Sequence, residues 1–213
     1  MQSKTRAGAL ALAAAMSVAG LAAADQAKKP ADPARTSADQ ASPMDDKAMM
    51  EAWMQVATPG AGHKALEPVV GTWDAKITMW MAPGAPPQES TGTSESMWVL
   101  DGRFVEQRYE GNFMGQPFSG VGYTGYDNYK KKYVGTWMDT MGTMIMVSQG
   151  DADSTGKTLS MTSTIDDIIT GKPASIKSEI KIMGPDHHLM EMWGPDPTGK
   201  QFKTMEIHYT RKK

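Results

Sequence analysis

Turn signals punctuate this chain at short, regular intervals from about residue 70 to the C-terminus. Segments rich in Val, Ile, Thr, Tyr and Trp alternate with Gly, Pro, Asn and Asp roughly every 10–12 residues, without helical spacing between them. The predicted strands lie near 71–81, 90–99, 103–112, 116–126, 132–140, 143–150, 157–165, 174–183, 187–193 and 200–210. A meander of that many strands curls, and closure removes its exposed edges. We therefore expect an all-β, antiparallel up-and-down barrel of eight to ten strands, spanning residues 60–213.

One amphipathic helix is predicted before the barrel, over residues 42–59. Ser42 is the expected cap, and Pro43 suits the first turn. The apolar stripe has the spacing i, i+3, i+4, i+7 and consists of Met50, Trp53, Met54 and Ala57. Such a helix serves either as a lid or plug laid across the barrel or as a contact surface for a partner protein.

The N-terminus has the pattern of a secretion signal over residues 1–24. Lys4 and Arg6 precede an uncharged run over 7–24, which closes in small residues suited to cleavage before Asp25. A membrane anchor is the rival interpretation, but the run is rich in Ala and lacks a basic stop. Residues 25–41 have the polar, aromatic-free composition of a flexible tether. We expect a periplasmic or secreted protein with no membrane span after cleavage.

Composition excludes several kinds of site. The chain has no cysteine, which rules out a lipid-modified cysteine, disulfides, thiolate catalysis and cysteine-based zinc sites. Without the signal, 20 basic residues face 24 acidic ones, and the two basic clusters fit a turn and a tail rather than a nucleic-acid surface. Residues 151–156 begin like a calcium loop, but no Glu stands at its twelfth position, so a hairpin turn is predicted. No catalytic motif and no cofactor are predicted.

Four stretches of the sequence resemble a bacterial family of lipocalin-like barrels that is labelled a domain of unknown function. They are GHKALEPVVGTWDAKITMW (62–80), WVLDGRFVEQRYEG (98–111), GYDNYKKKYVGTWMDTM (125–141) and MEIHYTRK (205–212). The resemblance covers about residues 60–211 and implies a fold of the calycin superfamily, without catalytic residues. Where the family pattern usually has a second glycine before Arg103, this chain has Asp101-Gly102, which a tight turn accommodates.

The same resemblance implies a structural pair at the two ends of the barrel. Trp73 stands at the start of the first strand, and Arg211 stands just past the last one. In a closed barrel these strands are neighbours, so we expect a buried Trp73 with the Arg211 guanidinium within about 6 Å of its ring.

Methionine and histidine offer two metal-related hypotheses. Of 19 methionines, 17 lie beyond the signal, against four leucines there. One cluster comprises Met138, Met141, Met144 and Met146, of which Met144 and Met146 are expected to share a strand face. Thioethers suit a soft metal such as Cu(I), whereas scarce leucine favours methionine as core filler or as the lining of an apolar cavity. The histidines are His63, His187, His188 and His208. A haem ligand from His208 is one hypothesis, and surface or capping roles are the other.

Two predicted strands alternate charge with aromatic residues. Glu106 and Arg108 share one strand face with Phe104, and Trp137 and Asp139 share another with Tyr133. Inward-facing, they would orient a polar ligand group; outward-facing, they would form ordinary cross-strand pairs, and parity alone leaves both open.

The leading functional hypothesis is a binding barrel for a small apolar or amphipathic molecule. Its predicted ligand-binding residues are Glu106, Arg108, Trp137, Asp139, Met144 and Met146. The alternatives are an enzyme that uses Asp139 or Glu106 as acid or base, a soft-metal or haem protein, and a protein-contact role for the helix.

Overall fold

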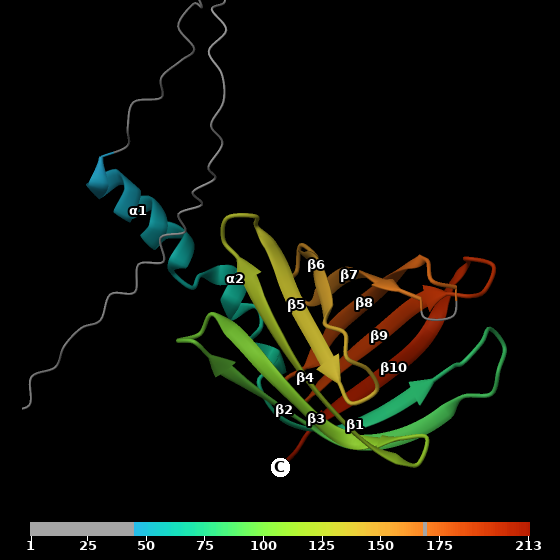
Figure 1. Ribbon diagram of the computed structural model, residues 1–213. Coiled ribbons are helices and arrows are strands. Elements are labelled where there is room, and N and C mark those ends of the chain that lie inside the picture. The colour runs from blue at the N-terminus through green and yellow to red at the C-terminus, as the bar shows by residue number, and fades with distance from the viewer. Residues whose placement is uncertain (1–44, 168–169) are drawn as a thin grey trace, which may run out of the picture. The chain divides into compact units, whose positions relative to one another are not determined.

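The computed structural model describes residues 45–167 and 170–213, which belong to one compact unit. Ten antiparallel strands form a closed barrel (Figure 1). The strands are β1 (Gly71–Met79), β2 (Gln88–Val99), β3 (Phe104–Phe113), β4 (Gln116–Asp127), β5 (Lys132–Asp139), β6 (Met146–Ala152), β7 (Thr158–Asp166), β8 (Pro173–Gly184), β9 (His187–Pro195) and β10 (Gln201–Arg211). Every predicted strand is present, with ends that differ by a few residues. The all-β barrel prediction is confirmed.

Each strand pairs with its neighbours in sequence, and β1 closes the barrel by pairing with β10. This is the up-and-down order that short connections produce. Closure places Trp73 directly opposite Arg211 in the register of the two strands. Residues about 140 apart in sequence are thereby neighbours.

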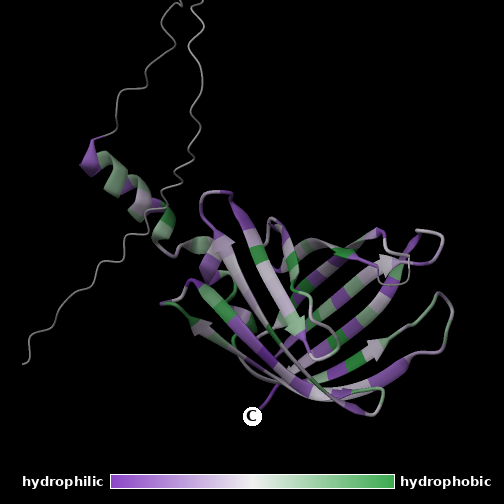
Figure 2. Ribbon diagram, viewed as in Figure 1, coloured by the Kyte–Doolittle hydropathy of each residue, from purple (hydrophilic) through white to green (hydrophobic). Residues whose placement is uncertain are grey.

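Successive side chains of each strand point to opposite sides of the barrel wall. Figure 2 shows the resulting bands of hydrophobic and hydrophilic residues along β8, β9 and β10. One buried cluster comprises Trp73, Ala75, Ile77, Tyr109, Ile207 and Tyr209. A second comprises Leu66, Val105, Tyr133, Leu159 and Met161. These two clusters identify the inward-facing positions of the strands that carry them.

One end of the barrel is covered by two short helical segments, α2 (Ala61–Lys64) and η1 (Glu67–Val69). Trp73 is fully buried there, and its indole Nε1 donates to Val69 O at 2.9 Å. The Arg211 Cζ lies 4.1 Å from the Trp73 ring centroid, inside the distance expected from the sequence. The guanidinium also donates to Val70 O at 3.0 Å. Backbone carbonyls and the indole face together fix Arg211 over the closed end.

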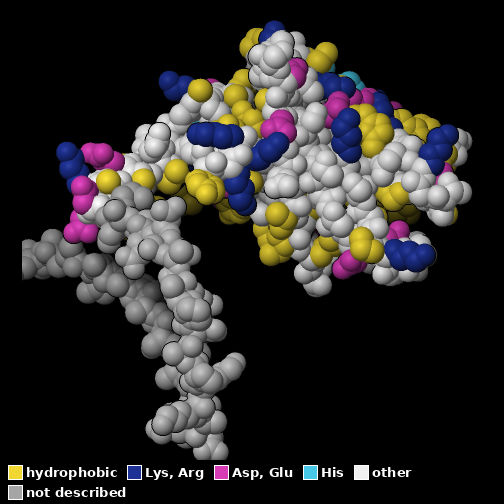
Figure 3. Space-filling model, turned by 90° about the horizontal axis from the view of Figure 1, so that it is seen from above, with side chains coloured by type: hydrophobic (Ala, Val, Ile, Leu, Met, Phe, Trp, Pro, Cys, Tyr) yellow, Lys and Arg dark blue, Asp and Glu magenta, His cyan; other side chains and the backbone are white. Residues whose placement is uncertain are grey.

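The predicted helix forms as α1 (Asp46–Ala57), but its cap and its role differ from expectation. The side chain of Asp45 caps it by accepting from Ala48 N at 2.7 Å. None of its residues is buried, and Trp53 is 66% exposed, so the lid or plug prediction is wrong. Figure 3 shows apolar side chains on the visible surface of α1. The alternative, a partner-contact role, stays a prediction.

Several predictions fall outside the described residues. They are the signal over 1–24, the tether over 25–41 and the start of the helix at 42–44. Within residues 45–167 and 170–213, no helix is long and apolar enough to cross a membrane.

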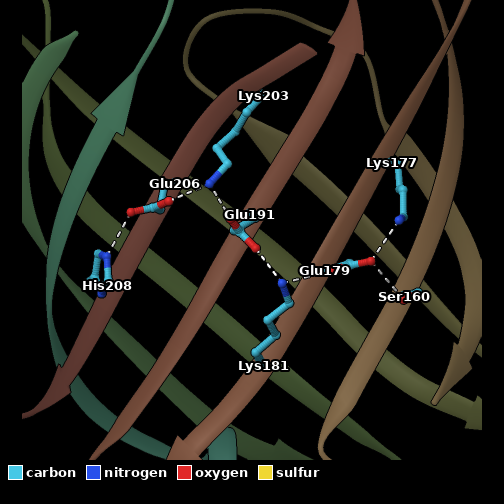
Figure 4. A network of polar contacts seen from close by, with 8 residues as sticks. All are labelled: Ser160, Lys177, Glu179, Lys181, Glu191, Lys203, Glu206 and His208. Atoms are coloured by element: carbon cyan, nitrogen blue, oxygen red, sulfur yellow. Dashed lines mark hydrogen bonds and ion pairs between the residues drawn. The ribbon is translucent and has the colours of Figure 1, made fainter. Parts of the chain in front are cut away.

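A chain of ion pairs crosses the outer face of β8, β9 and β10 (Figure 4). We call this the outer ion network; its members are Lys177, Glu179, Lys181, Glu191, Lys203, Glu206 and His208. The hydrogen bond from Lys177 is the main cause that lowers the pKa of the Glu179 carboxyl. Burial alone would raise the pKa of Glu191, but Lys181 and Lys203 outweigh it and lower that pKa. The lysines of the network therefore pair with the nearly buried Glu179 and Glu191 carboxylates, which would otherwise be costly to bury.

Candidate functional site

We call the end of the barrel opposite α2 the mouth. Five hairpins surround it, joining β1 to β2, β3 to β4, β5 to β6, β7 to β8 and β9 to β10 (Figure 1). Three of these hairpins carry exposed apolar side chains: Met81, Met114, Met141, Met144 and Ile145. The rim of the mouth is therefore apolar along β1 to β6.

Trp137 is the largest side chain of the interior near the mouth. It packs against the buried cluster around Trp73, together with Met79, Phe118, Met190 and Met205. All five side chains are only partly buried. Large apolar groups are usually either covered or scattered singly, so this group of half-covered side chains is a candidate binding surface.

Two glycines make room for the Trp137 ring. A Cβ at Gly120 would overlap Trp137 Cζ2, and a Cβ at Gly122 would lie 2.8 Å from Trp137 Cε3. Both glycines belong to β4, which pairs with β5, so the indole lies flat along the neighbouring strand. Glycine in a strand interior often marks such a close approach.

Asp139 holds the Trp137 ring in place. Its Oδ2 accepts from Trp137 Nε1 at 2.9 Å, and its Oδ1 accepts from Met141 N at 2.9 Å. Both carboxylate oxygens are therefore already used, one by the ring and one by the hairpin. In this arrangement Asp139 is a positioning residue for the indole.

The two predicted methionines lie at different depths. Met146 is opposite Trp137 in the β5–β6 register and is partly buried. Met144 precedes β6 rather than sharing a strand face with Met146, and it is 47% exposed on the rim. The expectation of a common strand face is therefore wrong, because β6 begins only at Met146.

Glu106 and Arg108 lie on the outer side of the wall. Val105 and Tyr109, which alternate with them along β3, belong to the buried clusters. Glu106 accepts hydrogen bonds from Arg108 Nε and from Tyr123 Oη, the latter at 2.9 Å. The hydrogen bond to Glu106 is the largest cause that raises the pKa of Tyr123. The inward-facing alternative is wrong for this pair, whereas Trp137 and Asp139 do face inward.

The four histidines lie in three different environments: helix α2, the outer side of the wall and the buried interior. His63 caps α2, since its Nδ1 accepts from Gly60 N at 3.0 Å. His208 lies on the outer side, bonded to Glu206 at 2.9 Å and to His187 at 3.2 Å. His188 contradicts the surface expectation: it is 5% exposed, between Trp73 and Tyr209. Burial, with smaller effects of His187 and Arg211, lowers the pKa of His188 to about 3.

Residues 151–156, whose sequence begins like a calcium loop, lie at a hairpin turn, as the sequence predicted. Asp153 Oδ1 accepts from Thr155 N at 3.0 Å and from Lys157 N at 3.1 Å between β6 and β7. Hydrogen bonding to Thr155 is the main cause that lowers the pKa of Asp153 to about 2.

Sequence reasoning missed Phe118, Met79 and Tyr109 as interior residues near the mouth. A usable signal was present in the strand glycines. A Cβ at Gly92 or Gly111 would meet the Tyr109 ring, and a Cβ at Gly120 or Gly122 would meet the Trp137 ring. Such glycines mark a close approach of a ring to the strand, although Gly125 makes the same approach to Phe104 on the outer face.

A family profile described as "Protein of unknown function (DUF1579)" matches residues 58–211. The chain belongs to the DUF1579 family. The expected resemblance to a family of unknown function is confirmed, and the closed antiparallel barrel is consistent with the lipocalin-like fold that this resemblance implied. A search of curated proteins gave no significant match.

Solved structures with the same fold are distant in sequence from this DUF1579 protein. Rv2717c from M. tuberculosis is 15% identical with a TM-score of 0.55, over 73% of this chain and 100% of that one. The S-type phycobiliprotein lyase CPES from Guillardia theta is 14% identical with a TM-score of 0.52, over 73% of this chain and 99% of that one. At these identities the similarity shows the fold alone.

Proposed function

We propose that this DUF1579 protein is an exported carrier that binds a small apolar or amphipathic molecule in the mouth of its barrel. The observation that carries the proposal is the half-covered lining formed by Trp137, Phe118, Met79, Met190 and Met205. Burying one such aromatic or thioether side chain against a ligand contributes about 1.5–3 kcal/mol. Several together support micromolar binding after the costs of association.

The architecture supports the same role. The closed end is sealed by Leu66, Trp73 and Arg211, so a ligand enters from the mouth. Trp137 is pre-positioned by Asp139 and by the two glycines beneath it, which lowers the entropic cost of binding. Methionines in the lining adapt their shape to more than one ligand.

Titration of the mature protein with Nile red, a neutral hydrophobic dye, tests the proposal. We expect saturable binding and a loss of at least about tenfold in affinity for Trp137→Ala. Trp53→Ala removes an exposed indole from α1 and is the matched control, with no expected effect. Failure of Nile red to bind, or equal effects of the two substitutions, contradicts the proposal.

A location outside the cytoplasm is part of the proposal and depends on the signal segment. We expect the exported chain to begin at Asp25 or within a few residues of it. Intact-mass measurement on the periplasmic fraction checks this, and a full-length chain in the membrane contradicts it.

A further inference from the structure

The barrel wall opens between β2 and β3 near the mouth. Their pairing runs from Val99–Phe104 to Gly92–Gly111 and ends there, although both strands continue. Beyond that point, residues 88–91 pair with β1 and residues 112–113 pair with β4. A cavity of about 270 Å³ lies between the two hairpins, lined by Met79, Gln88, Glu89, Ser90, Thr91, Asn112, Met114 and Gly115. This volume suits one end of a ligand rather than a whole one.

Two buried hydroxyls without a hydrogen-bond partner lie at this opening. Tyr109 is 3% exposed, and its Oη has no partner within the described residues. Ser90 Oγ, which also has none there, belongs to a residue that lines the cavity. Burial raises the pKa of the Tyr109 phenol, so it stays a neutral donor.

The strand glycines direct Tyr109 toward the opening. A Cβ at either Gly92 or Gly111 would overlap the Tyr109 hydroxyl, so the ring lies across the last paired residues of β2 and β3. Ser90 is the next position of β2 on the same face as Gly92. Both hydroxyls therefore lie beside the region where β2 and β3 separate.

A buried hydroxyl without a partner destabilises the protein, and a ligand that supplies the missing hydrogen bond removes that cost. We propose that Tyr109 and Ser90 form the polar subsite of the mouth and bind a neutral oxygen group, a hydroxyl or carbonyl, of an amphipathic ligand. This inference rests on the proposed function. The apolar part of the ligand lies on the Trp137 lining, since Met79 belongs to both the cavity and that lining.

Charge around the cavity selects a neutral group over a carboxylate. The charged residue that lines the cavity is Glu89, which pairs with Lys76 at 3.2 Å on the outer side of the wall. A carboxylate ligand would lose its hydration beside Glu89 with no cation supplied by the lining. The ligand class is therefore a long-chain alcohol, ester or amide.

Three pyrene-labelled probes of equal chain length test the subsite: a terminal alcohol, the matching carboxylic acid and the matching alkane. We expect the alcohol to bind the mature protein about tenfold more tightly than the alkane, which corresponds to about 1.4 kcal/mol. Tyr109→Phe should make the alcohol and the alkane bind equally tightly, and Ser90→Ala should reduce the preference for the alcohol. Tyr209→Phe is the matched control, because its buried hydroxyl already accepts from Gln107 Nε2 at 3.4 Å and the ratio should stay unchanged.

Thermal unfolding without ligand supplies an independent readout. Tyr109→Phe should leave the Tm unchanged or raise it, because it removes a hydroxyl that has no partner. A fall in Tm for Tyr109→Phe, or an unchanged alcohol-to-alkane ratio, overturns the subsite and assigns the hydroxyl an ordinary internal or water partner. Tighter binding of the acid than the alcohol overturns the neutral ligand class. If the wild-type protein binds alcohol and alkane equally, the subsite alone is wrong; if it binds no probe, the proposed function fails with it.

Discussion

The contact between Trp73 and Arg211 makes a quantitative prediction about barrel closure. Trp73 is 0% exposed and donates to Val69 O, so Trp73→Ala should lower the free energy of unfolding by about 3–5 kcal/mol. Arg211 places its guanidinium 4.1 Å from the ring and donates to Val70 O and Pro185 O, both at 3.0 Å. Its side chain is 32% exposed, which weakens these charge-assisted bonds. We therefore expect Arg211→Ala to cost about 2 kcal/mol.

A double-mutant cycle isolates the interaction between the two side chains. The cation–π contact predicts a coupling free energy of about 1 kcal/mol in urea unfolding followed by circular dichroism. Arg211→Lys should recover only part of the loss, because an ammonium lacks the flat face and the separate donor nitrogens of a guanidinium. Lys212→Ala is the control: its Nζ lies 3.8 Å from Asp74 at the surface, so its effect should be small. A coupling below about 0.3 kcal/mol would refute the reasoning, since the two ends would then be energetically independent.

Further predictions concern the interior, the outer wall and the pH dependence of stability. Gly120→Ala should lower the free energy of unfolding by about 1–3 kcal/mol, because its Cβ would displace Trp137, whereas Gly184→Ala has open space and should be near neutral; calorimetry compares them. The Glu179, Glu191 and Glu206 carboxyls have lowered pKa values, so their stabilisation is present above the unfolded value of 4.5 and is lost as the pH falls below it. The Lys181 and Lys203 amines have raised pKa values, so their contribution is lost only as the pH rises past 10.5. Burial lowers the pKa of His188 to about 3, so stability is also lost as the pH falls below the unfolded histidine value of 6.5. Burial raises the pKa of Tyr209 to about 12, so stability is also lost as the pH rises above the unfolded tyrosine value of 10.0. A Tm plateau is therefore expected between pH 6.5 and pH 10.0. Lys203→Met should reduce the loss of Tm below pH 4.5, and an unchanged loss there would contradict this account of the outer ion network.

The alternation along the chain was sufficient to predict the strands and their order. Turn residues such as those at 101–102 and 197–199 separate the strands, and short connections force neighbours in sequence to pair. The family motif also identified Trp73 and Arg211 as partners across the closure. Helix α1 was predicted from its apolar stripe, because local spacing alone defines a helix.

Local pattern did not determine which face of a strand is inside. Glu106 and Trp137 each share a strand face with other charged or aromatic residues, yet closure turns Glu106 outward and Trp137 inward. The burial of His188 between Trp73 and Tyr209 likewise depends on three strands meeting in space. The apolar stripe of α1 fitted both a lid on the barrel and a contact for a partner protein, and local spacing could not decide between them.

The sequence by itself therefore determined the secondary structure, the meander and the aromatic–cation pair that closes it. These depend on period-two alternation, on turn chemistry and on a motif, all of which are local. Only the tertiary structure decided the inner face, the half-covered lining around Trp137, the outer ion network and the opening between β2 and β3. Each of these depends on the register of strands distant in sequence, and a shift of one residue in that register exchanges the two faces of the wall.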